Sequence, residues 1–423
     1  MTPGPPDVLC GRVRRGHVVV VVVAALALPP APLAAQAMFG AQITPVLTRA
    51  DPVPGGSSLT ELRFTAPFLM GTADFLGGRL RLHATLDGEG WTMPGGQLAT
   101  GGFGEGWEDR RHPHTWAHEL LVTAIDLTPV PGGVHWSLTA GKGFAPYGTD
   151  DPMSRPALGY PVNHHWSQIL ERAVAILGLR YGPVTLEGAI FNGDEPERWD
   201  QWPNWRRFTD SWSLRALIQP SAAVELQASY AQVRSPDNRP GAGPGHDKVS
   251  VSARMEHALG SGRIYGLAEW AYNSEANGFF KYYSGLAEAQ WSRAAHRAYV
   301  RFERTDRPEE ERVFGNPFRW NLPHLENSTI GMTRWSIATA GYGRGLTPAH
   351  LPVHMEVIAE VEYARVTSLT GLFDPTSFYG RSDLWMASAA LRIAAGEPMH
   401  RMGRYGVAAD GGHVMMMPSP ERE

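Results

Sequence analysis

The sequence predicts an all-β protein, a transmembrane antiparallel up-and-down β-barrel of about sixteen strands, within a range of roughly 14–18. Three observations lead to this fold class. The chain begins with a segment typical of export, apolar and polar residues then alternate with period two, and short connections alternate with long ones.

The N-terminal segment has the three parts of a secretory signal peptide. Arg12, Arg14 and Arg15 form a basic region, an apolar run follows over 18–28, and Ala35-Gln36-Ala37 matches a signal peptidase site. The apolar run is about eleven residues long, whereas a membrane-spanning helix needs roughly 20, so a helical anchor is the less favoured alternative. We therefore expect residues 1–37 to be removed, and Cys10, the single cysteine, with them.

The composition of the whole sequence excludes some classes of protein. The 38 Lys and Arg and the 42 Asp and Glu are interspersed along the sequence, which argues against nucleic-acid binding. After residue 37, no apolar run reaches the length of a membrane-spanning helix. Because unpaired backbone groups are too costly in lipid, a membrane-embedded chain of this kind must form a closed barrel.

Alternation is the dominant pattern in the mature chain. It runs through the segments near 79–86, 224–230, 249–256, 297–303 and 356–363, with charged residues opposite the apolar ones. A soluble β-sandwich also alternates, and this remains the alternative. The predicted strands are often about 9–14 residues long, which suits transmembrane strands better than ordinary strands of about 5–6 residues.

The lengths of the connections favour a transmembrane barrel over a soluble β-sandwich. Tight connections are expected near 129–133, 182–183, 220–222, 260–262 and 292–295, and a looser one near 343–352. Long ones are expected near 88–115, 143–170, 192–211, 234–247, 275–281, 306–326 and 368–382. Outer-membrane barrels have short periplasmic turns and long extracellular loops. We therefore predict a barrel over 38–394 with periplasmic ends, followed by a flexible periplasmic tail over 395–423.

Charged residues on the polar faces of these strands must point into the lumen, because each would cost a few kcal/mol on the lipid side. The predicted pore-lining residues are Arg79, Arg81, Arg215, Glu225, Arg254, Glu256, Glu269, Glu288, Arg301, Glu303, Glu356, Glu360 and Glu362. Opposed rows of acid and base would create a transverse field across a pore, or would pair and brace the wall.

Two long loops carry histidines that could ligate a divalent transition metal. The candidate ligands are His112, His114, His118, His164 and His165, close in sequence to Glu119, Asp150 and Asp151. No spacing matches a strong zinc signature, so hydrogen bonds that order an inward-folded loop are the favoured interpretation, and no cofactor is predicted.

Two further patterns support alternative functions. Met399, His400, Met402 and His413, with the methionines at 415–417, would suit Cu(I) and a copper-linked outer-membrane protein, although a flexible tail with incidental methionines is the favoured interpretation. His165-Trp166-Ser167 resembles the H-x-S arrangement on a strand of outer-membrane phospholipase A. The downstream stretch 171–181 lacks the asparagine that orients that histidine, so no catalytic residue and no enzymatic activity are predicted.

A longer series of motifs resembles a family. In order these are His112-Pro113-His114, Asn163 to Ser167 (NHHWS), Glu187-Gly188 with Phe191 to Pro196 (FNGDEP), and Asp210 to Ser213 with Arg215. This series, over roughly 108–300, is similar to uncharacterised porin-like proteins of bacterial outer membranes. The resemblance implies an outer-membrane location, with contact to outer-membrane lipids, and the barrel fold; it supplies no substrate. The water-filled lumen expected of about sixteen strands, and the absence of a catalytic motif, predict a channel for small hydrophilic solutes. A homotrimer is expected by analogy with large porins. Asp194 departs from the arginine that is more usual there.

Overall fold

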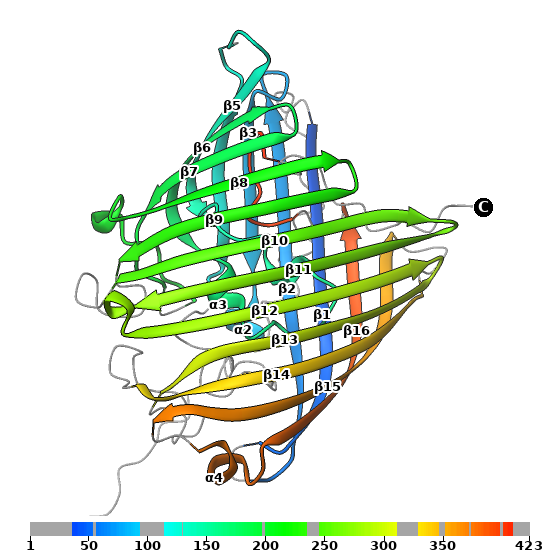
Figure 1. Ribbon diagram of the computed structural model, residues 1–423. Coiled ribbons are helices and arrows are strands. Elements are labelled where there is room, and N and C mark those ends of the chain that lie inside the picture. Colours follow the sequence, from blue (N-terminus) through cyan, green and yellow to red (C-terminus); the bar gives the residue numbers. More distant parts are fainter. Residues whose placement is uncertain are drawn as a thin grey trace, which may run out of the picture.

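The computed structural model describes residues 36–53, 56–93, 114–128, 130–196, 199–234, 245–310, 329–346, 352–371, 374–397 and 401–408. Sixteen strands form one closed barrel, whose strands are steeply tilted (Figure 1). Their bounds are β1 Gln36–Asp51, β2 Leu59–Phe75, β3 Leu80–Asp87, β4 Ala117–Ile125, β5 Val134–Gly143, β6 Arg172–Tyr181, β7 Val184–Phe191, β8 Ser211–Ser221, β9 Val224–Arg234, β10 Gly245–Leu259, β11 Gly262–Glu275, β12 Phe280–Arg293, β13 His296–Glu310, β14 Thr329–Gly345, β15 Val353–Gly371 and β16 Asp383–Gly396.

Every strand pairs antiparallel with its sequence neighbours, and β1 pairs with β16 to close the barrel. The closing register runs from Gly40 opposite Gly396 to Asp51 opposite Trp385. The predicted fold class and strand number are therefore confirmed. The expected signal peptide lies outside the described residues, except that β1 already begins at Gln36.

Alternation orients each strand as the sequence predicts. In β9, Glu225 and Gln227 are buried inside the barrel, whereas Leu226 between them is 41% exposed on the outer face. Successive side chains of a strand point to opposite faces, so one register places both Glu225 and Gln227 on the inner face. Some aromatic residues of the strands point inward. Phe191 and Tyr282 are fully buried, as is Trp335, where the Arg307 guanidinium lies 4.7 Å from the ring centre.

The two ends of the barrel differ in the length of their connections. One end has tight turns, such as 182–183 and 260–261, where Gly182 and Gly260 have positive φ values of 55° and 59° that favour glycine. The other end has long connections, including 88–116 and 144–171. The connection after β11 is short, contrary to expectation, because β11 and β12 extend to a 3₁₀ turn, η5 (Ala276–Gly278).

Short helices lie within these connections. They are α2 (Glu89–Thr92), η3 (Pro152–Ser154), α3 (His164–Ser167), η4 (Trp205–Arg207) and α4 (Pro375–Tyr379). None of the helices in the described part of the chain is long and apolar enough to cross a bilayer.

The barrel interior holds a packed core. One apolar cluster combines wall residues such as Leu121 and Phe191 with Phe144 of the 144–171 connection and with Met402 and Tyr405, which follow the last strand. Connection 144–171 and segment 401–408 therefore fold into the barrel and fill part of its lumen.

The position of residues 401–408 corrects the prediction of a flexible tail for this part of the chain. Met402 is fully buried, and Arg401 and Arg404 are each 1% exposed. Both guanidinium groups bind Glu225 of β9. Glycine and charge in the sequence suggested disorder, but the charges find buried carboxylate partners inside the barrel.

The FNGDEP motif has a structural role at the end of β7. Asn192 is fully buried; its Oδ1 accepts a hydrogen bond from the Ala173 backbone at 2.7 Å, and its Nδ2 donates to the Asp194 carbonyl at 2.8 Å. A Cβ on Gly193 would lie 2.1 Å from the Arg234 carbonyl oxygen, so only glycine fits there. The motif joins β6, β7 and the end of β9.

Candidate functional site: the lumen

The inner wall of the barrel is lined by charged side chains that pair with one another. Arg215 of β8 donates to Glu187 of β7 at 2.6 Å, and Arg301 of β13 donates to Glu288 of β12 at 2.9 Å. All four side chains are at most 5% exposed. Because buried charges are costly unless paired and hydrogen-bonded, these cross-strand pairs stabilise a polar inner surface.

Connection 144–171 crosses the lumen, and its backbone amides donate hydrogen bonds to further carboxylates of the barrel wall. The amide of Leu158 donates to Glu360 and the amide of Val162 donates to Glu303, each at 2.8 Å. In return, Arg301 donates to the carbonyl of Gly159 at 2.8 Å. The connection is thus held at several points along β13 and β15.

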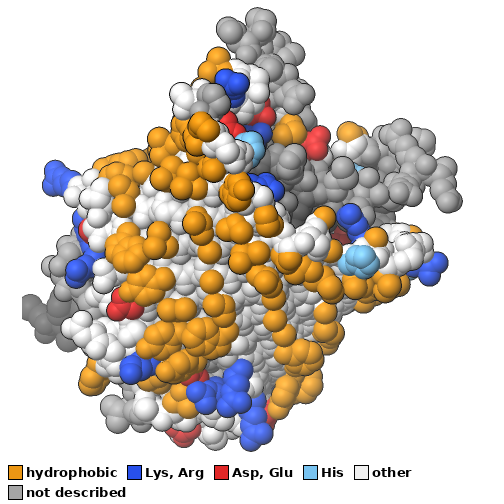
Figure 2. Space-filling model, turned by 45° about the horizontal axis from the view of Figure 1, so that its top comes forward, with side chains coloured by type: hydrophobic (Ala, Val, Ile, Leu, Met, Phe, Trp, Pro, Cys, Tyr) orange, Lys and Arg blue, Asp and Glu red, His pale blue; other side chains and the backbone are white. Residues whose placement is uncertain are grey.

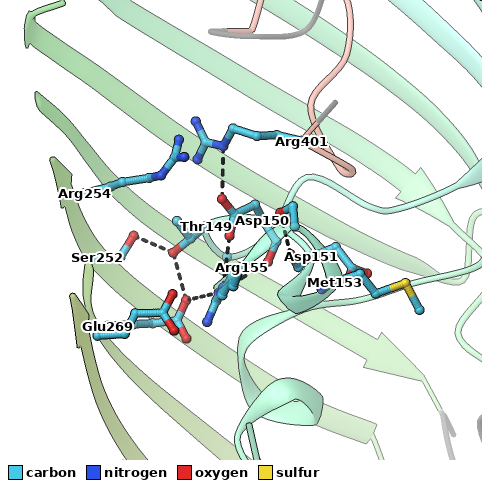
Figure 3. A network of polar contacts seen from close by, with 12 residues as sticks. Thr149, Asp150, Asp151, Met153, Arg155, Ser252, Arg254, Glu269 and Arg401 are labelled. Carbon is cyan, nitrogen blue, oxygen red and sulfur yellow. Dashed lines mark hydrogen bonds and ion pairs between the residues drawn. The ribbon is translucent and has the colours of Figure 1, made fainter. Parts of the chain in front are cut away.

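A second set of bonds fixes the middle of this connection to β11. Arg155 donates to Glu269 at 3.1 Å and Thr149 donates to Glu269 at 2.8 Å (Figure 3). Asn163 donates to the other oxygen of Glu269 at 2.9 Å. All of these side chains are buried. One wall carboxylate therefore anchors both ends of the segment 149–163.

Segment 401–408 packs against the same connection. Asp150 accepts from Arg401 at 3.0 Å and from Arg155 at 3.1 Å (Figure 3). Arg401 also donates to Glu225 at 2.9 Å. Burial alone would raise the pKa of the Asp150 carboxyl, but Arg401 and Arg155 hold that pKa below its ordinary value. Asp150 is therefore ionised and links the two inward segments.

Further along the segment, the bonds reach β4, β5 and β8. Tyr405 donates to Glu119 at 2.6 Å and accepts from the Phe144 amide, while the Val407 amide donates to Ser137 at 3.1 Å. Arg215 donates to the Gly403 carbonyl at 2.8 Å. The segment is thus integrated into the interior by backbone and side-chain bonds together.

Most of the predicted pore-lining residues lie inside the barrel. The buried ones are Arg215, Glu225, Arg254, Glu269, Glu288, Arg301, Glu303, Glu360 and Glu362. Arg81 and Glu356 are half-buried and paired, with Asp74 and with Arg297 and Arg392 respectively. Glu256 is exposed near the end of β10, and Arg79 is exposed in the β2–β3 turn, outside the strands.

Sequence reasoning missed several residues of the lumen. Asp150, Arg155, Arg401 and Arg404 lie in connections or after the last strand, where period-two alternation gives no signal. Glu187 could have been included, because it alternates with outward-facing Leu186 in β7.

The candidate histidine ligands fall into two pairs. The rings of His114 and His118 are 5.2 Å apart, and those of His164 and His165 are 3.8 Å apart. The ring of Tyr160 lies between the pairs, 5.7 Å from His114 and 5.8 Å from His164. A single metal site formed by both pairs therefore does not exist in this arrangement; His112 lies outside the described residues.

The H-x-S residues do not occupy a barrel strand. His165 and Ser167 belong to the one-turn helix α3 inside the lumen, and the Ser167 hydroxyl is fully buried with no hydrogen-bond partner among the described residues. This placement differs from the strand arrangement that the sequence pattern resembles.

The architecture is that of outer-membrane porins: a closed sixteen-stranded antiparallel barrel with charged residues inside. An anion-selective porin from Comamonas acidovorans has a similar fold, with a TM-score of 0.50, 10% identity, and coverage of 85% of this chain and 99% of that chain. OmpT, an outer membrane protein of Vibrio cholerae in trimer form, is similar with a TM-score of 0.48, 8% identity, and coverage of 85% and 99%.

Pseudomonas aeruginosa OccK3 (OpdO) gives a TM-score of 0.38 at 11% identity, covering 86% of this chain and 97% of that chain. No family model matches the chain, and no curated protein matches it. The specific family suggested by the motif series therefore stays a prediction.

Proposed function

We propose that the protein is a porin-like channel of a bacterial outer membrane, through which small hydrophilic solutes diffuse passively. The observation that carries the proposal is the division of residues between the two faces of one closed barrel. Large apolar side chains such as Leu214, Phe302 and Val361 are 56%, 59% and 52% exposed outside, whereas ionic groups line the interior.

The outer surface supports placement in lipid. Figure 2 shows apolar side chains spread over the visible outer face of the barrel, with Lys and Arg mainly near its margins. Such an apolar band flanked by polar ends matches a bilayer core with its two interfaces. The long connections would then lie on the extracellular side and the tight turns on the periplasmic side.

The interior supports a narrow and polar path rather than a wide pore. Connection 144–171 and segment 401–408 occupy the lumen, and acidic and basic groups alternate around them. We infer that solutes pass between paired charges, so that selectivity for anions over cations is weak. The buried Ser167 and its helical context support a channel rather than a phospholipase-like enzyme.

The test is conductance. Refolded mature protein, inserted in a planar bilayer in 1 M KCl, is expected to give discrete current steps, with similar permeability for K⁺ and Cl⁻. Protein that inserts and shows heat-modifiable migration on a gel, but passes no ion current, would contradict the channel proposal. Cross-linking of the same material tests the predicted homotrimer: monomers alone would make that prediction wrong.

A further inference from the structure

Three side chains that could ligate a metal lie close together at the C-terminal end of β3. Asp87 is the last residue of β3, Glu89 opens α2, and His114 lies just before β4. Their ligand atoms all lie within 4.8 Å of one another. Nδ1 of His114 is 2.7 Å from Oε2 of Glu89 and 3.5 Å from Oδ2 of Asp87.

The surrounding structure orients one oxygen of each carboxylate toward His114. The other oxygen of Glu89, Oε1, accepts from the Thr65 hydroxyl at 3.1 Å and from the Ala66 amide at 2.9 Å. Oδ1 of Asp87 accepts from the Glu89 amide at 2.7 Å. The carboxylates are therefore held from behind by β2 and the chain itself, with Oε2 and Oδ2 facing the imidazole.

One of these oxygens, Oδ2 of Asp87, has no hydrogen bond in the described part of the chain and makes only the 3.5 Å contact with His114. Asp87 is 1% exposed. A buried carboxylate oxygen without a hydrogen bond is rare in folded proteins. The oxygen that lacks a hydrogen bond is also the one directed toward the cluster.

The other basic side chains nearby contact different groups. Nδ1 of His118 is hydrogen-bonded to Oε1 of Glu171 at 2.7 Å, and Lys142 lies 3.6 Å from the same carboxylate. Arg63 donates to Thr48 at 2.9 Å and lies 3.9 Å from Glu61. Among the described residues, His114 is thus the basic side chain in direct contact with both Asp87 and Glu89.

We propose that Asp87, Glu89 and His114 form a binding site for a divalent transition-metal cation. Two carboxylate oxygens and one imidazole nitrogen suit Zn²⁺, with bonds of about 2.0–2.2 Å and water as the remaining ligand. Small side-chain shifts would bring the present separations to those of a common centre. Mg²⁺ and Ca²⁺ prefer oxygen ligands alone and fit this set less well.

The proposed ligand set differs from the histidine cluster expected from the sequence. It uses a single histidine of that cluster, with two carboxylates that sequence reasoning did not select. The proposed site does not depend on the channel proposal. The His114 ring packs edge-on against Tyr160 of connection 144–171, at 5.7 Å, so a cation bound to His114 would stabilise the contact between the two connections.

Calorimetric titration of the refolded full-length mature protein with Zn²⁺ tests the site. We expect one Zn²⁺ per chain, an affinity at least tenfold weaker in both Asp87→Asn and His114→Gln, and little binding of Ca²⁺. The matched control is His135→Ala, because His135 pairs with Asp126 at 2.7 Å in a similar way but is exposed at the other end of the barrel. This variant should bind Zn²⁺ like the wild type.

A second measurement distinguishes a metal site from a hydrogen-bonded cluster. Zn²⁺ should raise the unfolding temperature of the wild type and of His164→Ala, but not that of Asp87→Asn. No binding by the wild type, binding that survives Asp87→Asn, or binding lost in His164→Ala would each overturn the proposal. None of these results depends on whether the barrel conducts ions.

Discussion

At the residue scale, Asp150 is the side chain that joins the two segments inside the barrel. It is 5% exposed and accepts from Arg401 and Arg155. Because it has two cationic partners, its loss would leave both guanidinium groups with one fewer acceptor in a buried setting. Removing one member of a buried ion pair costs about 3–5 kcal/mol.

We therefore predict that Asp150→Asn lowers the free energy of unfolding by about 3–5 kcal/mol at neutral pH, measured by urea unfolding in lipid vesicles. The control is Asp51→Asn, because the Asp51–Arg381 pair is about half exposed and such pairs contribute about 0–1 kcal/mol. Equal effects of the two substitutions would contradict the structural role of Asp150.

The Asp150 carboxylate also makes the free energy of unfolding depend on pH. Its pKa in the folded protein lies below the ordinary value of 3.8, so its stabilising contribution is present above pH 3.8 and is lost as the pH falls through the lower, folded value. The difference in stability between wild type and Asp150→Asn should be constant from pH 8 to 5 and shrink below about pH 4. A difference that persists unchanged to pH 2 would contradict this assignment.

At the scale of elements, segment 401–408 lies inside the barrel beside connection 144–171. Its backbone and three of its side chains are bonded to β4, β5, β8 and β9. In a channel, such a segment reduces the cross-section that is open to ions.

Removing residues 398–423 should therefore increase single-channel conductance in planar bilayers, whereas removing only 409–423 should leave it near the wild-type value. The shorter deletion controls for loss of the chain end, because it keeps Arg401, Arg404 and Tyr405. Equal conductance of all three proteins would show that the segment does not restrict the path.

The outer face of a strand gives a prediction about lipid contact. Phe302 lies near the middle of β13 and is 59% exposed, while Leu259 ends β10 at a tight turn and is 56% exposed. In a bilayer, Phe302→Arg should destabilise the barrel by about 2–4 kcal/mol, and Leu259→Arg by about 0–1 kcal/mol. Similar small losses in both variants would indicate that the barrel wall does not face hydrocarbon.

At the scale of the whole molecule, closure depends on the pairing of β1 with β16, which are separated by almost the entire chain. This pairing removes the last unpaired strand edges, which could not be accommodated in lipid. The folded barrel should resist detergent at room temperature and migrate faster than heated protein on a gel.

Deleting residues 383–397 should abolish the fast-migrating form, because β1 and β15 would both be left as open edges. Removing 409–423 provides the control, since all sixteen strands remain. A fast-migrating form without β16 would show that closure by these two strands is not required.

The alternation and the connection lengths were sufficient to predict the barrel, its sixteen strands and most of the charged wall residues that are buried inside, although Arg79 lies in a turn and Glu187 was missed. These are local properties: a strand has period two, so Glu225 and Leu226 must lie on opposite faces wherever the strand is placed. Tight turns such as 260–261 likewise carry their own signal in glycine.

Only the tertiary structure decided what fills the lumen and which groups meet there. Arg401 and Asp150 are far apart in sequence, and nothing in the neighbourhood of either predicts that they pair. Likewise, Asp87 and His114 meet because a long connection returns to the same barrel end. Such contacts depend on burial and on the partners that closure of the barrel brings together, which no local pattern encodes.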